Sequence, residues 1–233
     1  MKPILVILFF SIFIDTFASD LHIETASTNV SYNYFSLPNE SEANRVDLPK
    51  KDSNISYRLF YEKNYGRWSW TLLYAPLSIN DTFTSEKGFK FNNTNFTAGQ
   101  MTSVKYVFNS YRLGYRRNYY YGGSRLYYGA LIKIRDAEIC ITQNTSKDCY
   151  DNIGPVPLLN VGVELNFKNI YLASNIDGLW SSRGSAYDAN LELGLNLRLF
   201  KLATGIRVLG GGADNETLVN FAQFQSAYLK LIF

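Results

Sequence analysis

The sequence predicts an all-β fold, a closed antiparallel up-and-down β-barrel that crosses a membrane with about ten strands. Apolar and polar residues alternate over stretches of about nine to eleven residues, which is the length a tilted strand needs to cross a bilayer. Aromatic residues make up 16% of the 233 residues, and Tyr and Phe suit both strands and membrane–water boundaries. No stretch after residue 18 keeps a helical period of 3.6 residues, so no helix is expected in the barrel.

The first 18 residues have the pattern of an export signal. Lys2 supplies a positive charge, residues 4–14 are almost all apolar, and Thr16 and Ala18 stand three residues and one residue before a cleavage point. The apolar stretch is too short to span a bilayer. We therefore predict a signal peptide at 1–18 and one barrel domain at 19–233, with a retained N-terminal anchor as the alternative.

Regular alternation begins at Ile55 and is clearest in 189–199, where apolar side chains occupy one face and Asn, Glu, Gly and Arg the other. Stretches 159–167 and 126–134 repeat the pattern. A soluble β-sandwich also alternates, but its strands are nearer five or six residues long. In a membrane barrel the apolar face meets lipid and the polar face lines the lumen.

The connections alternate between short and long, as they do in barrels with short turns on one side of the membrane and long loops on the other. About nine strands follow Ile55, and an even number requires one more, which 29–37 supplies; residues 19–51 are otherwise expected to be a polar segment. Eight strands remain the alternative. The short connections lie near 65–66, 122–123, 168–169 and Lys201, and the long ones at 77–101, 141–155, 181–186 and 210–217.

The two cysteines, Cys140 and Cys149, lie close together in a polar stretch. An exported protein meets an oxidising compartment, so we expect a disulfide that closes an external loop and stabilises it by roughly 2–3 kcal/mol in the chain-entropy model. Two free thiols are the alternative. No metal site and no cofactor are expected, because the single histidine, His22, lies far away near the N-terminus.

The C-terminal residues resemble the last strand of bacterial outer-membrane β-barrels, which ends in an aromatic residue preceded by apolar residues at alternate positions. Here these residues are Phe233, Leu231 and Leu229. The architecture is similar to that of the small OmpA-like, OmpX-like and OmpW-like barrels, although no functional motif of theirs matches residue by residue. The resemblance implies a place in the bacterial outer membrane, recognition of the C-terminus by the barrel-assembly machinery, and contact with membrane lipids and lipopolysaccharide. A monomer is favoured.

The residue content argues against catalysis and against nucleic-acid binding. Known outer-membrane barrel enzymes use a histidine as base or partner, and His22 is expected in a polar segment before the first strand, so we predict that the chain is not an enzyme. A formal net charge of +3 without any basic run gives no reason to expect nucleic acid as a partner.

Charged residues of both signs are predicted to face the lumen, where they must pair because an isolated charge in low dielectric is costly. A salt-bridged interior that plugs the barrel is the favoured interpretation, with a structural or surface-interaction role. The first alternative is a narrow channel for small solutes or ions, and the second is a soluble secreted β-sandwich that binds a partner. The predicted lumen residues are Arg58, Glu62, Arg112, Arg125, Lys133, Arg135, Glu164, Glu192, Arg198 and Arg207.

Overall fold

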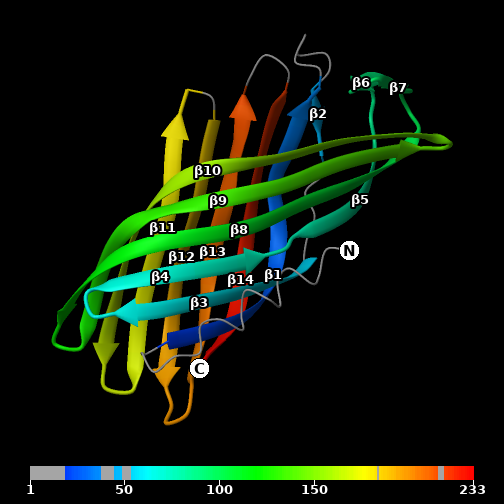
Figure 1. Ribbon diagram of the computed structural model, residues 1–233. Coiled ribbons are helices and arrows are strands. Elements are labelled where there is room, and N and C mark those ends of the chain that lie inside the picture. The colour runs from blue at the N-terminus through cyan, green and yellow to red at the C-terminus, as the bar shows by residue number, and fades with distance from the viewer. Residues whose placement is uncertain (1–18, 38–44, 49–53, 183, 215–217) are drawn as a thin grey trace, which may run out of the picture.

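The computed structural model describes residues 19–37, 45–48, 54–182, 184–214 and 218–233 (Figure 1). The predicted signal peptide at 1–18 lies outside the described residues. Among the described residues, no helix is both long enough and apolar enough to cross a membrane.

The barrel is a closed antiparallel ring with ten strand positions, one of which is shared by two short consecutive strands. Each strand pairs with its neighbours in sequence, and β14 (Val219–Ile232) pairs with β1 (Ser19–Ser36) to close the ring. The predicted up-and-down fold is confirmed with ten positions, and the alternatives of eight strands and of a soluble sandwich are wrong. The barrel strands are β1 (Ser19–Ser36), β3 (Asn54–Tyr65), β4 (Trp68–Ala75) continued by β5 (Ser78–Thr84), β8 (Met101–Tyr121), β9 (Ser124–Gln143), β10 (Ser146–Phe167), β11 (Ile170–Ser181), β12 (Gly184–Asn196), β13 (Lys201–Asp214) and β14 (Val219–Ile232).

The two ends of the barrel differ, as Figure 1 shows. The end that we call the turn end carries the four predicted short connections, and there the backbone groups of Leu21 and Phe233 hydrogen-bond to each other at 3.0 Å. At the opposite end β5 and the outer parts of β8, β9 and β10 project beyond the remaining strands. We call this projection, residues 78–84, 101–109, 136–143 and 146–154, the arm, and the end that bears it the arm end.

Strand β1 begins at Ser19, ten residues before the predicted start of a strand at 29. The reason is that its outward-facing residues Thr25, Ser27 and Asn29 are polar, as are many that face inward, so the sequence shows no apolar face. Backbone pairing with β3 on one edge and β14 on the other forms the strand instead.

The predicted loop at 141–155 is also a strand region, because β9 and β10 stay paired up to Gln143 and Ser146. The predicted loop at 77–101 contains β5 and a small hairpin of β6 (Phe89–Phe91) and β7 (Thr94–Phe96). A further short strand, β2 (Val46–Asp47), pairs with β1 beyond the stretch that β3 covers.

The polarity of the strands reverses between the membrane and the arm, although alternation continues without a break. On β8, Arg112 and Arg116 face the interior and Leu113 faces outward, whereas farther along Tyr106 is buried inside and Lys105 lies outside. The arm therefore has an apolar interior and a polar exterior, like a water-soluble β-domain. Its core joins the hairpin to the barrel and contains Val30, Phe35, Leu37, Leu77, Ile79, Phe89, Phe91, Phe96, Val104, Tyr106, Ile139, Ile141 and Phe224.

Outward aromatic residues mark both edges of the lipid-facing band. Near the turn end Trp68 stacks on Tyr115, with ring centroids 4.9 Å apart, and near the arm Tyr74 stacks on Tyr111 at 5.2 Å. Between them the exposed side chains are largely Leu, Ile and Val, as on β12, where Leu193 is 54% exposed. Such girdles flank the apolar band of outer-membrane barrels.

Candidate functional site: the barrel lumen

Three guanidinium groups meet one carboxylate near the middle of the lumen. Asp188 on β12 pairs with Arg58 Nη2 at 2.9 Å and Arg112 Nη2 at 2.8 Å through Oδ2, and with Arg207 Nε at 3.2 Å through Oδ1. Arg58 on β3 and Arg112 on β8 reach Asp188 across the lumen, whereas Arg207 lies on β13, the strand next to β12.

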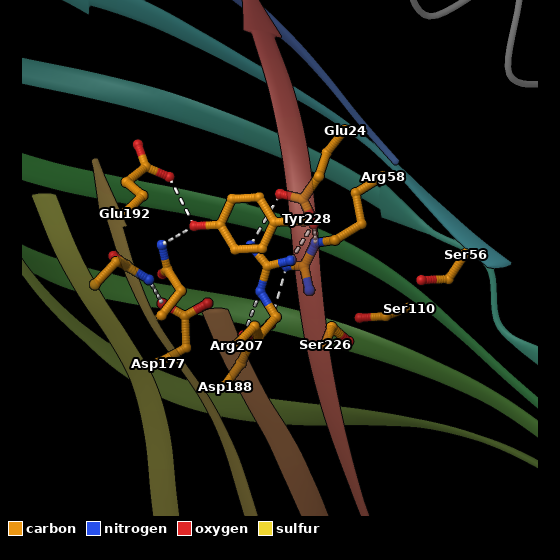
Figure 2. Close-up of polar contacts among 12 residues, drawn as sticks. Glu24, Ser56, Arg58, Ser110, Asp177, Asp188, Glu192, Arg207, Ser226 and Tyr228 are labelled. Carbon is orange, nitrogen blue, oxygen red and sulfur yellow. Dashed lines mark hydrogen bonds and ion pairs between the residues drawn. The ribbon is translucent and has the colours of Figure 1, made fainter. Parts of the chain in front are cut away.

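Two more carboxylates extend this cluster. Arg112 Nη1 lies 2.6 Å from Asp177 Oδ2, and Arg207 binds both carboxylate oxygens of Glu24 through its two terminal nitrogens. Figure 2 shows Arg58 and Arg207 turned towards Glu24 and Asp188 from β3 and β13. We call Glu24, Arg58, Arg112, Asp177, Asp188 and Arg207 the lumen ionic network. All six side chains are nearly shielded from solvent.

A second group of ion pairs lies nearer the turn end. Arg125 Nη1 and Nη2 donate to the carboxylate of Glu62 at 3.0 and 3.3 Å, while Arg116 Nη1 lies 3.9 Å from the same carboxylate. Glu164 lies 3.8 Å from Arg125 and 3.9 Å from Lys201. Because both signs are paired, the desolvation cost of each charge is offset by its neighbours.

Tyrosine rings fill much of the remaining space. Tyr228 donates a hydrogen bond to Glu192 at 2.8 Å, and Lys230 pairs with the same carboxylate. The ring of Tyr171 lies so close to Gly194, its direct partner on the next strand, that a Cβ there would overlap it. The same relation holds for the cross-strand pairs Tyr127–Gly162, Tyr187–Gly210 and Tyr228–Gly205.

Two of the predicted lumen residues, Lys133 and Arg135, face the interior but form no ion pair with a described residue. A third, Arg198, does not face the interior. Lys133 is buried but makes no ion pair with any described residue, and Arg135 donates to Asn152 at 3.0 Å rather than to a carboxylate. Arg198 is exposed in the turn after β12, because the strand ends at Asn196. The other seven predicted residues, Arg58, Glu62, Arg112, Arg125, Glu164, Glu192 and Arg207, lie in the ion pairs described above.

Sequence reasoning missed several interior charges, namely Asp20, Glu24, Arg116, Asp177, Asp188, Lys201 and Lys230. Glu24 was missed because its strand shows no apolar face. Asp177 and Asp188 face each other as direct partners on β11 and β12, next to a stretch expected to be a loop. Following the alternation of β12 back from Glu192 by four residues would have found Asp188.

His22 does not lie in a polar segment before the barrel, as expected, but on β1 inside the wall. Its ring contacts Phe60 edge-on at 4.8 Å, and its buried Nε2 has no hydrogen-bond partner among the described residues. The prediction that the chain is not an enzyme relied on a histidine that lies away from the barrel. Because His22 lies inside the barrel, that argument no longer supports the prediction.

The predicted disulfide is present and joins Cys140 to Cys149, which are directly opposite each other on β9 and β10 with Cα atoms 4.1 Å apart. It links two paired strands of the arm rather than closing a loop. At the C-terminus, Leu229, Leu231 and Phe233 project outward from the wall; their recognition by an assembly machinery stays a prediction.

The described residues enclose a cavity at each end of the interior and a smaller one of about 30 Å³ between them, which is lined by Arg58, Arg207 and Phe108 among others. The cavity at the turn end, of about 110 Å³, is lined by His22, Glu62, Glu192 and members of the lumen ionic network. The cavity at the arm end, of about 400 Å³, lies between β8 and β14. These two end cavities share no lining residue.

No protein-family model matches the sequence, and no curated protein matches it. Among solved structures, the outer membrane protease OmpT from Escherichia coli superposes with a TM-score of 0.57 at 10% identity, over 95% of this chain and 99% of that one. The translocator domain of the autotransporter NalP from Neisseria meningitidis has a TM-score of 0.44 at 8% identity, over 95% and 91% of the two chains. The attachment invasion locus protein Ail of Yersinia pestis has 0.41 at 6%, over 91% and 98%.

At these identities the likeness to OmpT concerns the fold alone. Together with the closed ring of ten strand positions, it gives this chain the architecture of a small bacterial outer-membrane β-barrel.

Proposed function

We propose that this chain is a non-enzymatic, closed outer-membrane barrel whose role is structural and lies at the cell surface. The observation that carries the proposal is the lumen ionic network, in which Arg112 and Asp188 join opposite parts of the wall. A barrel of this size has an interior little wider than its own side chains, so buried ion pairs across it leave no continuous water path.

The hairpin covers part of the interior above the network. Beneath the hairpin the interior side chains are apolar, and the aromatic rings of Phe91 and Phe35 contact each other edge-on at 5.1 Å. An ion that entered on this side would have to leave water and pass between these rings, which is costly. This favours a plug over the alternative of a narrow channel.

The surface role rests on the arm. Its outer face is polar, with Asn80, Lys105 and Glu138 around a shallow depression, and its apolar core and the disulfide at Cys140 connect its strands. Outer-membrane barrels have short periplasmic turns and long external segments, so we place the arm outside the cell and the turn end in the periplasm.

Conductance in a planar lipid bilayer tests the plug. The wild-type protein is expected to give no steady single-channel steps. A variant in which Arg112, Asp188 and Arg207 are all replaced by Ala is the positive control, because removing the centre of the network opens a water path and steps should appear. Steady steps from the wild type would establish the channel instead.

Epitope labelling of intact cells tests the surface role. An epitope inserted in the turn at Asn144–Thr145 should be reached by antibody on intact cells, because this turn lies at the tip of the arm. The matched control is the same epitope at Gly122–Gly123, on the turn end, which should be reached only after the outer membrane is permeabilised. The reverse pattern would refute the proposed orientation.

A further inference from the structure

The arm-end cavity of about 400 Å³ exists because small residues face the interior on β9, β12 and β13. Ala137 on β9, Ala186 on β12, and Gly211 and Ala213 on β13 all line it, where elsewhere in the lumen arginine and tyrosine side chains stand. Its volume is in the range of small-molecule sites, which are commonly 300–1,000 Å³. Residues from the ends of β11 and β12, such as Ser181 and Gly184, also line it, so it reaches the rim of the barrel.

Two basic side chains, Lys133 and Arg135, stand in this cavity, and none of its lining residues is acidic. Lys133 is 2% exposed, and its ammonium lies 4.6 Å from the centre of the Phe108 ring. Arg135 bonds only the neutral side-chain oxygen of Asn152, and its buried Nε has no partner within the described part of the chain.

This arrangement contrasts with the rest of the lumen. Arg58, Arg112 and Arg207 share carboxylates across the barrel, and Asp188, the acidic centre of that network, is already engaged by all three. Leaving a buried cation without an anion costs several kcal/mol. An anion that entered the cavity would offset that cost for Lys133 and Arg135.

The walls of the cavity are apolar. Phe108 and Tyr106 form one side, and Leu179 and Val156 line another part of it. Inorganic sulfate or phosphate would satisfy the cations and leave these surfaces in water, whereas an apolar or aromatic body would cover them.

We propose that the arm-end cavity binds small organic anions, with a carboxylate, sulfonate or phosphate group against Lys133 and Arg135 and an apolar or aromatic body between Phe108 and Leu179. This site goes beyond the proposed structural role. It is compatible with a closed barrel, because the lumen ionic network lies beneath it and the ligand enters and leaves at the arm end.

Calorimetry of the full mature protein in phosphatidylcholine nanodiscs tests the site, with empty nanodiscs as the blank. Naphthalene-2-sulfonate is expected to bind saturably with one site per barrel, and neutral 2-naphthalenemethanol and inorganic sulfate at least tenfold more weakly. Equal binding of the neutral compound, or no saturable binding of the sulfonate, would overturn the proposal.

Three variants locate the site. Lys133→Met should weaken sulfonate binding at least tenfold, and Lys105→Met, which removes an exposed cation from the arm, should leave it unchanged. Ala186→Leu keeps every charge but fills the cavity, so it should also abolish binding. Folding of each variant is checked by heat-modifiable migration in a gel, and folded Lys133→Met and Ala186→Leu proteins that bind like the wild type would refute the assignment.

Discussion

Arg112 on β8 and Asp188 on β12 form an ion pair of 2.8 Å between strands that have three other strands between them in the sheet. The pair holds the wall together through the lumen, in addition to the backbone hydrogen bonds that run around it. Asp188 also forms ion pairs with Arg58 and Arg207. Its carboxylate therefore pairs with three guanidinium groups, more cations than any other described acidic residue pairs with.

We predict that Asp188→Asn lowers the free energy of unfolding by about 3–5 kcal/mol, since it leaves buried guanidinium groups without their shared counter-charge. Urea titration of the protein in lipid vesicles, followed by tryptophan fluorescence, measures the change. Asp47→Asn is the control, because Asp47 pairs with Arg45 at 2.8 Å on the surface and such exposed pairs contribute about 0–1 kcal/mol. Equal effects of the two substitutions would contradict the structural role of the network.

Gly194→Ala should destabilise the barrel by about 1–3 kcal/mol, because the added methyl group overlaps the Tyr171 ring and forces the ring or the strand to move. Gly154→Ala is the matched control, since a Cβ there meets only Asn152 Oδ1 at 3.8 Å. The control should be neutral or slightly stabilising, because alanine loses less backbone entropy than glycine. The same unfolding titration compares them, and a harmless Gly194→Ala would show that the ring does not need the space.

Asp148 fastens the hairpin of β6 and β7 to the arm. Its carboxylate accepts hydrogen bonds from Asn92 Nδ2 at 3.1 Å and from the Asn93 amide at 3.0 Å. Burial acts to raise the pKa of this carboxyl, but these hydrogen bonds and others from Thr94 and the Cys149 amide outweigh it, so the pKa lies below its usual value.

A carboxyl group with a lowered pKa in the folded state stabilises that state above its unfolded pKa of about 3.9 and loses the effect as the pH falls through the folded pKa. We therefore expect the hairpin amides to be protected from hydrogen exchange at pH 5–7 and to lose protection below about pH 4. Asp148→Asn should reduce protection already at pH 7, whereas Asp151→Asn, on the same strand, should not. Protection that is independent of pH in the wild type would contradict this anchoring.

The fold could be predicted because alternation over many residues is a strong signal and the short turns interrupt it at regular places. Strand β12 illustrates this, since its leucines face lipid as expected. The prediction failed at β1 because its outward residues, such as Thr25, are polar, as are many that face inward. It failed in the arm because a strand that leaves the lipid reverses its polarity, so that Ile139 faces inward and the pattern that identifies a membrane strand is lost.

The lumen was harder to predict than the wall. Alternation tells which side chains point inward, but it does not tell which meet, because Arg112 and Asp177 are brought together by the diameter of the ring. Only the structure shows that Lys133, with the same inward direction as Arg112, stands beside a phenyl ring instead of a carboxylate.

The reversal of polarity along β8 and β9 also determines how deeply the protein sits in its bilayer. At the boundary Asn109 donates a hydrogen bond to Asp136, its direct partner on the outer face, at 3.3 Å, while Tyr111 and Ile134 follow immediately on the lipid side. A thicker bilayer would bring this polar pair into hydrocarbon, and a thinner one would leave leucines in water. The chain itself thus specifies the membrane thickness that it tolerates, and bilayers that differ in acyl-chain length should differ in how readily they accept it.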